Sequence, residues 1–319
     1  MDFGKLPYDR LNTVNFSLPL EPEANKFVLT GQRAASPKVY IGCPRWSIKE
    51  WVGKLYPKGT KDANFLDAYI KQFNCIELNS TFYNLYDEAA ISKWTVKAEG
   101  QEFLFCPKVY QGISHDGSLT EKVPLMHAFE KSIRAFGEQL GPAFLQLSDG
   151  FGPQHKKELQ YFIHALPTAL NLFVELRHPA WFAPGELDWL VDLLRAVNKG
   201  LIITDTAGRR EVCHMRLALP KAFVRFVSNN LHPTDFVRID DWVNRIAHWI
   251  ENGLEELYFI VHMHEEKHSP ELVSYLMDGL NEKCGLQLKK PLLVQTASAS
   301  KPSRSGPSGI QPSLFDDLL

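Results

Sequence analysis

The sequence predicts an α/β fold: a single (β/α)8 TIM barrel with an N-terminal extension and a flexible C-terminal tail. Short runs rich in Val, Ile, Phe, Leu and Tyr recur eight times between residues 38 and 288. Segments with the apolar spacing of helices separate most of these runs, as in a barrel of alternating strands and helices. The runs are almost continuously apolar, which is typical of parallel strands covered on both faces.

The predicted strands are, in chain order, KVYIGC (38–43), CIELNSTF (75–82), EFLFCPKV (102–109), AFLQLS (143–148), LFVELR (172–177), LIITD (201–205), FVRFV (223–227) and LYFIVHMH (257–264). The alternative fold is a doubly wound open sheet, whose nucleotide-binding form needs a glycine-rich turn after its first strand. The first run is followed instead by Pro44, Arg45 and Trp46, and the sequence contains no GxxxxGKS/T motif. We therefore reject the common nucleotide-binding folds.

Helices are predicted from apolar residues that recur on one face. Such spacing occurs over residues 65–73 and 125–140. The stretch DDWVNRIAHWIENG (240–253) has an acidic first turn and ends at a glycine, and Ser269 before Pro270 marks another start. The sixth connection, residues 208–220, gives the weakest helical signal.

Composition describes an ordinary globular chain: 319 residues, 45% hydrophobic, 23% charged and a formal net charge of −2. We expect an extension at 1–36, the barrel at 37–288 and the tail at 289–319. No run approaches the roughly 18 apolar residues that span a bilayer, and the N-terminus lacks the apolar core of a secretion signal, so we expect a cytoplasmic protein without a membrane partner. The near-neutral charge does not favour a duplex-binding face. Five cysteines without a CxxC pair indicate buried, reduced thiols.

Polar residues lie toward the carboxyl ends of the predicted strands, where residues two apart share a face. They are Glu77, Asn79, Lys108, Gln146, Glu175, Arg177, Asp205, Arg225, His262 and His264. The loops at this end of a TIM barrel hold the substrate, so we expect one site there. Buried charges need partners, a ligand or a metal, because desolvating a lone ion is costly.

The predicted catalytic residues are Glu77, Lys108, Glu175 and Asp205. Glu77 and Glu175 are expected to be the general acid or base, because burial and neighbouring cations shift a carboxyl pKa in opposite directions. Lys108, Arg177 and Arg225 would bind a phosphate, a carboxylate or a developing oxyanion. The competing interpretation is a closed salt-bridge network of Glu77, Lys108, Glu175 and Arg225 that only fixes the barrel register.

A divalent metal is a candidate cofactor. The run HEEKH (264–268) fits the HExxH pattern of zinc peptidases, but that pattern requires both histidines on one helix, and this stretch is predicted to be a loop. A metal held by His262 or His264 together with Glu77, Glu175 or Asp205 is the stronger version of the hypothesis.

Six ordered segments also resemble a known family. They are IGCPRWSIKEW (41–51), FLDAYIKQFNCIELNSTFY (65–83), FCPKVYQGISH (105–115), FLQLSDGF (144–151), VELRHPAWF (174–182) and FVRF (223–226). Together they resemble the domain-of-unknown-function 72 family of YecE-like TIM-barrel proteins, over roughly residues 38–280. The resemblance implies a TIM barrel but brings no reaction with it.

The family's polar and aromatic signature falls, by this resemblance, on Trp46, Trp51, Glu77, Asn79, Tyr83, Lys108, His115, Gln146, Glu175, Arg177, His178, Trp181, Asp205 and Arg225. The predicted substrate-binding residues are Trp46, Asn79, Tyr83, His115, Gln146, Arg177, His178, Trp181 and Arg225. Aromatic residues at the mouth would provide flat walls for a sugar or a base. His178 precedes Pro179, so a loop cap is its alternative role. One corner departs from the family: His262, Met263 and His264 stand where an Asn pair is common.

The tail carries a separate signal. QPSLF (311–315) resembles the short motif by which bacterial proteins dock on the DNA sliding clamp. Leu314 and Phe315 would enter an apolar pocket while Gln311 hydrogen-bonds at its edge, with the preceding Ser, Pro and Gly residues as a tether. The alternative is that the tail packs back on the barrel.

The leading functional prediction is a hydrolase-type enzyme with acid–base or metal-assisted chemistry on a phosphorylated, glycosidic or nucleic-acid substrate. Its partner is then a small-molecule or nucleotide-like substrate. The alternative is a non-catalytic ligand-binding barrel recruited to the sliding clamp by its tail. A third interpretation treats the barrel as a folded anchor for the tail.

Overall fold

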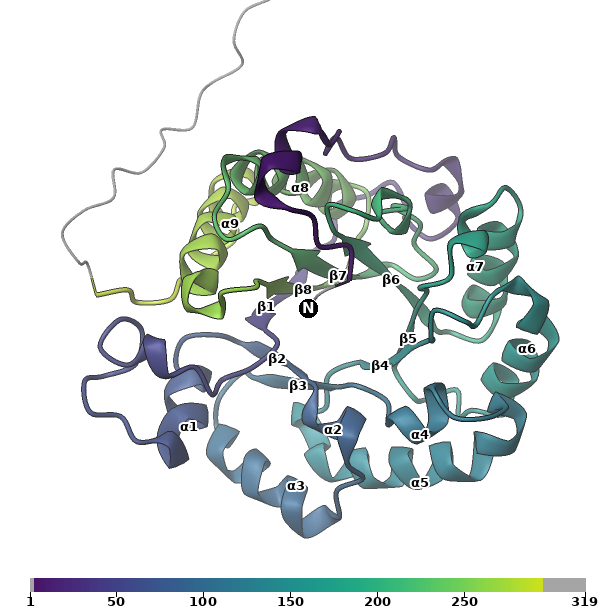
Figure 1. Cartoon of the computed structure of the whole chain (residues 1–319), viewed down its shortest axis with the longest axis horizontal. Coiled ribbons are helices and arrows are strands. Elements are labelled where there is room, and N and C mark those ends of the chain that lie inside the picture. The colour runs from purple at the N-terminus through teal and green to yellow at the C-terminus, as the bar shows by residue number, and fades with distance from the viewer. Residues whose placement is uncertain (1–2, 295–319) are drawn as a thin grey trace, which may run out of the picture.

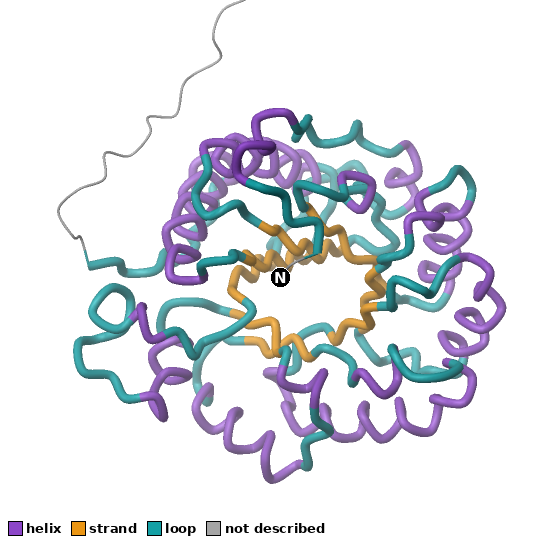
Figure 2. The backbone as a smooth tube through the Cα atoms, viewed as in Figure 1, coloured by secondary structure: helices purple, strands orange, loops and turns teal. Residues whose placement is uncertain are grey.

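The computed structural model describes residues 3–294, and in it eight parallel strands form a barrel surrounded by helices (Figures 1 and 2). The strands are β1 (Lys38–Cys43), β2 (Cys75–Leu78), β3 (Leu104–Pro107), β4 (Ala143–Gln146), β5 (Leu172–Glu175), β6 (Gly200–Asp205), β7 (Lys221–Val227) and β8 (Glu256–His262). Their order in the sheet is β3-β2-β1-β8-β7-β6-β5-β4. The predicted TIM barrel is confirmed.

The barrel closes weakly between β3 and β4. Only isolated bridges join these strands, with the backbone nitrogen of Val109 donating to the carbonyl of Phe144 at 2.9 Å. Gly141 donates to the carbonyl of Phe105 at 2.8 Å, and a Cβ at Gly141 would lie 2.8 Å from the sulfur of Cys106. A glycine is therefore needed where the chain approaches β3 to complete the barrel.

Several strands end earlier than predicted. Strand β2 ends at Leu78, β3 at Pro107 and β5 at Glu175, so Asn79, Lys108 and Arg177 lie just beyond the strand ends. The chain turns there into short helices or loops, which the apolar run alone does not reveal. These side chains consequently project from the rim of the barrel.

The α-helices between the strands are α1 (Phe65–Ile70), α2 (Ser80–Tyr83), α3 (Glu88–Thr95), α4 (Gln111–Ser114), α5 (Val123–Ile133), α6 (Lys156–His164), α7 (Glu186–Ala196), α8 (Pro233–Glu251) and α9 (Ser269–Cys284). The sixth connection contains only a short 3-10 turn, in keeping with its weak signal. Helix α9 begins at Ser269 as predicted.

Three helix boundaries differ from the prediction, the first because α1 ends at Ile70 rather than at residue 73. The helix expected over residues 125–140 ends at Ile133, because the next turn is a 3-10 helix interrupted at Gly137, where φ is 58°. Helix α8 begins at Pro233 rather than at residue 240. The ring of His232 caps this start by accepting from the backbone nitrogen of Thr234 at 3.3 Å.

Two apolar layers hold the barrel together. A large outer core lies between the strands and the helices, and a small inner core fills the barrel itself. The inner core consists of Tyr40, Cys75, Cys106, Phe144, Phe173, Ile202, Phe223, Tyr258 and Ile260. Because this packing fills the lower barrel, the space left inside the barrel for a ligand lies toward the carboxyl ends of the strands. All five cysteines are free and buried.

The N-terminal extension lies along the barrel as a strap, here defined as residues 3–36. It passes from the mouth of the barrel along α8 to β1 (Figure 1). Glu21 accepts hydrogen bonds from Arg245 and Trp249 of α8, each at 2.9 Å. Near the mouth, Leu11 and Phe16 form a small apolar cluster with Ala207. The strap is thus attached near the mouth and along α8.

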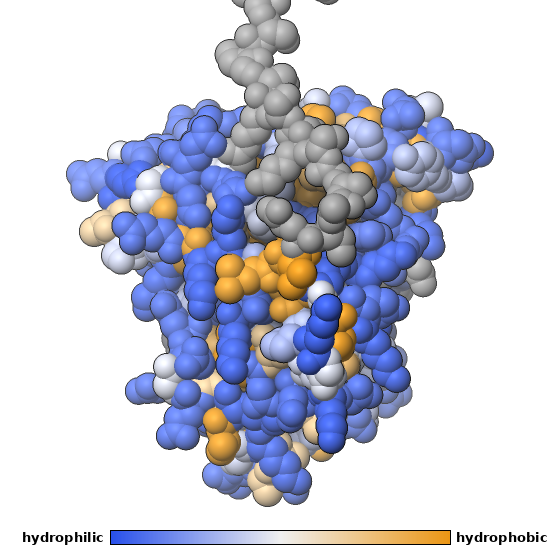
Figure 3. Space-filling model, turned by 90° about the vertical axis from the view of Figure 1, so that its left-hand side faces the viewer, coloured by the Kyte–Doolittle hydropathy of each residue, from blue (hydrophilic) through white to orange (hydrophobic). Residues whose placement is uncertain are grey.

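The side of the molecule seen in Figure 3 is mostly hydrophilic, with small apolar areas. Within residues 3–294, no helix is long and apolar enough to cross a membrane.

Candidate functional site

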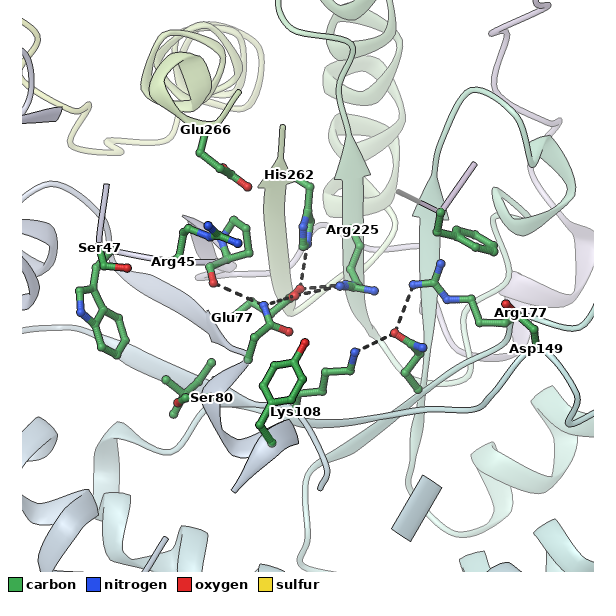
Figure 4. A pocket seen from close by; sticks show the side chains of 17 residues that line it. Arg45, Ser47, Glu77, Ser80, Lys108, Asp149, Arg177, Arg225, His262 and Glu266 are labelled. Atoms are coloured by element: carbon green, nitrogen blue, oxygen red, sulfur yellow. Dashed lines mark hydrogen bonds and ion pairs between the residues drawn. The ribbon is translucent and has the colours of Figure 1, made fainter. Parts of the chain in front are cut away.

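A pocket of about 490 Å³ opens at the carboxyl ends of the strands (Figure 4). Nine of the predicted site residues line it: Trp46, Glu77, Asn79, Tyr83, Lys108, Gln146, Arg177, Arg225 and His262. They come from strands, or from the segments directly after strands, on both halves of the barrel. The structure therefore assembles in one cavity residues that are up to 216 positions apart, from Trp46 to His262.

The floor of the pocket is Arg225, which β7 places between two glutamates. Nε and one terminal nitrogen of Arg225 donate to the two oxygens of Glu77, each at 2.8 Å. The other terminal nitrogen donates to Glu175 at 2.6 Å. Glu175 also pairs with Arg177 at 2.8 Å and accepts from Thr204 at 2.5 Å. All these charged side chains are at most 3% exposed, so their charges are compensated within the protein.

This arrangement fixes the protonation states of the floor. Burial raises the pKa of Glu77 and Glu175, but the neighbouring guanidinium groups outweigh it. The pKa of Glu77 consequently lies well below its usual value, and that of Glu175 falls to about 2. Both groups are ionised at neutral pH. Because each already accepts several hydrogen bonds, the floor is a fixed electrostatic platform.

His262 extends the floor along β8. Its Nε2 lies 3.0 Å from the second oxygen of Glu77. Burial lowers the pKa of His262 below its usual value, with Arg225 acting in the same direction against the attraction of Glu77. The neutral ring then donates Nε2–H to the carboxylate, which determines its tautomer.

Lys108 and Arg177 converge on one wall. Both donate to Oε1 of Gln146, Lys108 at 2.8 Å and Arg177 at 3.4 Å. The ammonium of Lys108 also lies 4.0 Å from the centre of the Phe82 ring. Burial, followed by repulsion from Arg225, lowers the pKa of Lys108 to about 8. An anion in the pocket would relieve this repulsion.

Glu266 approaches the opposite wall from the loop after β8 (Figure 4). One of its oxygens accepts from the hydroxyl of Ser269, the first residue of α9, at 2.8 Å. Burial raises the pKa of Glu266 to about 7, against the smaller opposing effects of Ser269 and Arg45. Glu266 is therefore a lining carboxyl group that changes protonation near neutral pH.

Six predicted residues lie outside the pocket lining: His115, Glu175, His178, Trp181, Asp205 and His264. Glu175 lies beneath the floor. The ring of His178 accepts from the backbone nitrogen of Ala180, so it caps a 3-10 turn, as its alternative role proposed. The indole of Trp181 is fully buried and donates to the carbonyl of Phe151 at 2.7 Å.

His115 and Asp205 contact neighbouring elements instead. The ring of His115 packs edge-on against Phe82, 5.2 Å away, behind the Lys108 wall. Asp205 is fully buried and accepts from the indole of Trp242 at 2.7 Å, with Arg238 as its ion-pair partner at 2.9 Å. Asp205 thus faces α8 rather than the pocket.

Of the predicted metal donors, His262 and Glu77 are brought together, at 3.0 Å. Among residues 3–294, no group of three or more His, Cys, Asp or Glu side chains has an arrangement that could hold a metal ion. His262 is bonded to Glu77, and HEEKH spans a bend and a 3-10 turn, so its histidines do not share one face of an α-helix. The predicted clamp-binding residues Gln311, Leu314 and Phe315 lie outside the described residues.

Sequence reasoning missed eight lining residues: Phe3, Pro44, Arg45, Ser47, Leu78, Ser80, Asp149 and Glu266. Four of the polar ones could have been found, since Arg45 and Ser47 follow β1, Asp149 follows β4 and Glu266 follows β8. Phe3 had no such signal, because only tertiary packing brings the strap to the mouth.

Relatives of known structure share this fold. A DUF72 family protein from Enterococcus faecalis V583 superposes with a TM-score of 0.59 at 17% identity, over 81% of this chain and 99% of that one. One from Thermotoga maritima MSB8 gives 0.56 at 18% identity, over 78% and 100%.

Among curated proteins, the UPF0759 protein YecE of Escherichia coli K12 is 27% identical over 263 residues, which cover 76% of this chain and 93% of YecE. The family model described as "Protein of unknown function DUF72" matches residues 40–296. This match covers most of the chain, so the protein belongs to the DUF72 family.

Proposed function

We propose that the pocket is the active site of a hydrolase that uses general acid–base catalysis on a phosphorylated substrate. The observation that carries the proposal is the pair of lining groups with pKa values near neutrality, Glu266 at about 7 and Lys108 at about 8. Efficient acid–base groups titrate near the working pH. Perturbed titrating groups in an open cleft are typical of active sites.

In this proposal the Lys108 wall binds the phosphate. Lys108 and Arg177 supply N–H donors to the phosphate. Gln146 holds the Lys108 and Arg177 side chains in place, because its Oε1 accepts from both. A phosphoryl group that gains negative charge in the transition state would be stabilised there.

Glu266 is the proposed proton-transfer group. As a carboxylate it takes a proton from the attacking water while the water oxygen bonds to phosphorus. The P–O bond to the alcohol breaks, and the protonated Glu266 gives that proton to the leaving oxygen. The products are the alcohol and inorganic phosphate, and Glu266 returns to its starting state.

Glu77 and Glu175 have no acid–base role in this proposal. Their pKa values are lowered, and both are hydrogen-bonded to Arg225. A glycosidic substrate is less favoured for the same reason, because that chemistry generally needs two carboxyl groups acting as acid and base or nucleophile. The two glutamates instead hold Arg225 in position.

The test is a screen of phosphate monoesters and diesters, with glycosides as a comparison, with and without added Mg²⁺, Mn²⁺ or Zn²⁺. On any substrate found, Glu266→Gln should lower kcat by about 100-fold or more, because a positioned acid–base group contributes this much. Glu265→Gln is the matched control, since Glu265 is the neighbouring residue but is exposed and does not line the pocket. Equal activity of Glu266→Gln and wild type on the same ester would refute the role of Glu266.

A second candidate is a ligand-binding barrel without turnover. The compensated floor favours it, because Glu77, Arg225 and Glu175 satisfy one another without a substrate. Saturable binding of a phosphate ester by calorimetry, with no product after prolonged incubation under every metal condition, would select this candidate.

A further inference from the structure

The strap contributes an aromatic side chain to the pocket. Phe3 is one of the lining residues, although it lies more than 30 positions before β1. The centre of its ring is 3.7 Å from the guanidinium carbon of Arg177 and 4.9 Å from that of Arg209. Phe3 therefore covers Arg177 at the wall that we assign to the phosphate.

This contact shields Arg177 from water. The Arg177 side chain is only 3% exposed, even though it stands at the open end of the barrel. A cation against an aromatic face is attracted by the ring, and the loss of water around the cation strengthens its interaction with a nearby anion. Phe3 itself is half-buried, so part of its ring remains available to a ligand.

Hydrogen bonds hold this end of the strap in place. The hydroxyl of Thr206 lies 3.0 Å from the carbonyl oxygen of Phe3 and 3.2 Å from that of Gly4. The backbone nitrogen of Gly208 donates to the carbonyl of Gly4 at 2.7 Å. Gly4 has a φ of 67°, and a Cβ there would lie 2.6 Å from the Thr206 side chain. Only glycine fits this close approach without displacing the strap.

We propose that the strap is a fixed wall of the site and that Phe3 contacts a flat apolar part of the phosphorylated substrate, next to its phosphate. The pocket has a volume of about 490 Å³ with Phe3 as one of its lining residues, so the ring borders the cavity rather than filling it. The substrate class is thus a phosphate ester whose alcohol carries a ring. This inference rests on the proposed function for its phosphate site.

The experiment compares two non-hydrolysable probes, methylphosphonate and phenylphosphonate, by calorimetry on the full chain. They share an anionic group, and only the second carries a ring. Wild type should bind phenylphosphonate more tightly. Phe3→Ala should reduce this preference by about three- to tenfold, the range expected for one aromatic contact.

Gly4→Ala tests the anchoring separately, because it keeps Phe3 but displaces the backbone that carries it. It should lower the ring preference as Phe3→Ala does. Leu20→Ala is the matched control within the strap, since Leu20 is 90% exposed, and it should leave the preference unchanged.

The inference would be overturned if wild type bound neither probe, or if Phe3→Ala left the ring preference unchanged. It would also be overturned if Phe3→Ala and Gly4→Ala both bound the probes more tightly, because the strap would then block the pocket. Failure of the proposed function looks different. Wild type would then bind both probes with the expected ring preference and yet hydrolyse no phosphate ester.

Discussion

Glu266 shows how one partly buried carboxyl group links stability to pH. Its pKa rises from 4.5 to about 7 in the folded protein, so folding favours the neutral form. Its contribution is complete below about pH 4.5 and is lost as the pH rises through about 7. At full ionisation the loss is of the order of 3 kcal/mol, from about 1.4 kcal/mol per pKa unit.

We therefore expect Glu266→Gln to be more stable than wild type at about pH 9 and similar to it at about pH 5. Gln keeps an oxygen for Ser269 but carries no charge. Thermal unfolding at both pH values measures the difference, with Glu265→Gln as the control. A stability difference that does not depend on pH would show that Glu266 titrates normally.

Lys108 should couple anion binding to protonation. Its pKa is about 8 in the empty pocket, and only the ammonium form attracts an anion. Sulfate is the suitable probe, because its own charge is constant over this range. Its affinity should fall as the pH rises through about 7, because Glu266 ionises, and by a further factor of about ten by about pH 9.5, because Lys108 loses its proton.

Lys108→Met should bind sulfate weakly and should lack the second of these decreases, while keeping the one due to Glu266. The exposed Lys93 supplies the control, Lys93→Met, which should behave as wild type does. Identical pH profiles for Lys108→Met and wild type would exclude Lys108 as the titrating group.

At the level of elements, Arg225 ties three strands together, because β7 carries it and its partners lie on β2 and β5. Arg225→Met removes the main cation from buried Glu77 and one of the two cations from buried Glu175. It should lower the free energy of unfolding by about 3–5 kcal/mol, as measured by chemical denaturation.

Removing Glu77 together with Arg225 separates the cost of an orphaned glutamate from the value of the network, because Glu175 keeps its ion pair with Arg177. The double variant of Glu77→Gln and Arg225→Met should recover much of the lost stability. Lys26→Met is the control, since Lys26 forms an exposed pair with Glu23, and it should cost about 1 kcal/mol or less. A double variant as unstable as Arg225→Met would contradict this interpretation of the network.

The strand pattern predicted most of the architecture and the end of the barrel at which the pocket lies. It did not predict which side chains point into that pocket. Alternation says that neighbours in a strand face opposite sides, without saying which side is inside. In β6 the inward residue is Thr204, which bonds to Glu175, and Asp205 points toward α8. Asp205 was predicted for the site because it ends its strand. It lies outside the site because its side chain points toward α8.

Glu266 and Phe3 show which features of the site could not be predicted from the sequence. A neighbouring exposed Glu265 carries the same residue type, so only burial distinguishes the carboxyl group that titrates near neutrality. Phe3 reaches the pocket through contacts with Thr206 and Gly208, about 200 residues away. Such long-range contacts leave no local periodic pattern.

At the level of the whole molecule, the proposed docking of the tail on a sliding clamp is independent of the pocket. Deleting residues 307–319, or combining Leu314→Ala with Phe315→Ala, should abolish binding to a purified bacterial clamp in surface plasmon resonance. Ser305→Ala should bind normally. Clamp binding that persists in the double variant would rule out the QPSLF motif as the contact.

The proposed acid–base site depends on two side chains of one pocket that titrate near neutrality. Site-resolved NMR titration of the Glu266 carboxyl carbon and the Lys108 ε-carbon tests this directly in the unliganded protein, with Glu266→Gln and Lys108→Met to assign the signals. We expect pKa values of about 7 and about 8. Values near the ordinary 4.5 and 10.5 would contradict the proposed acid–base site.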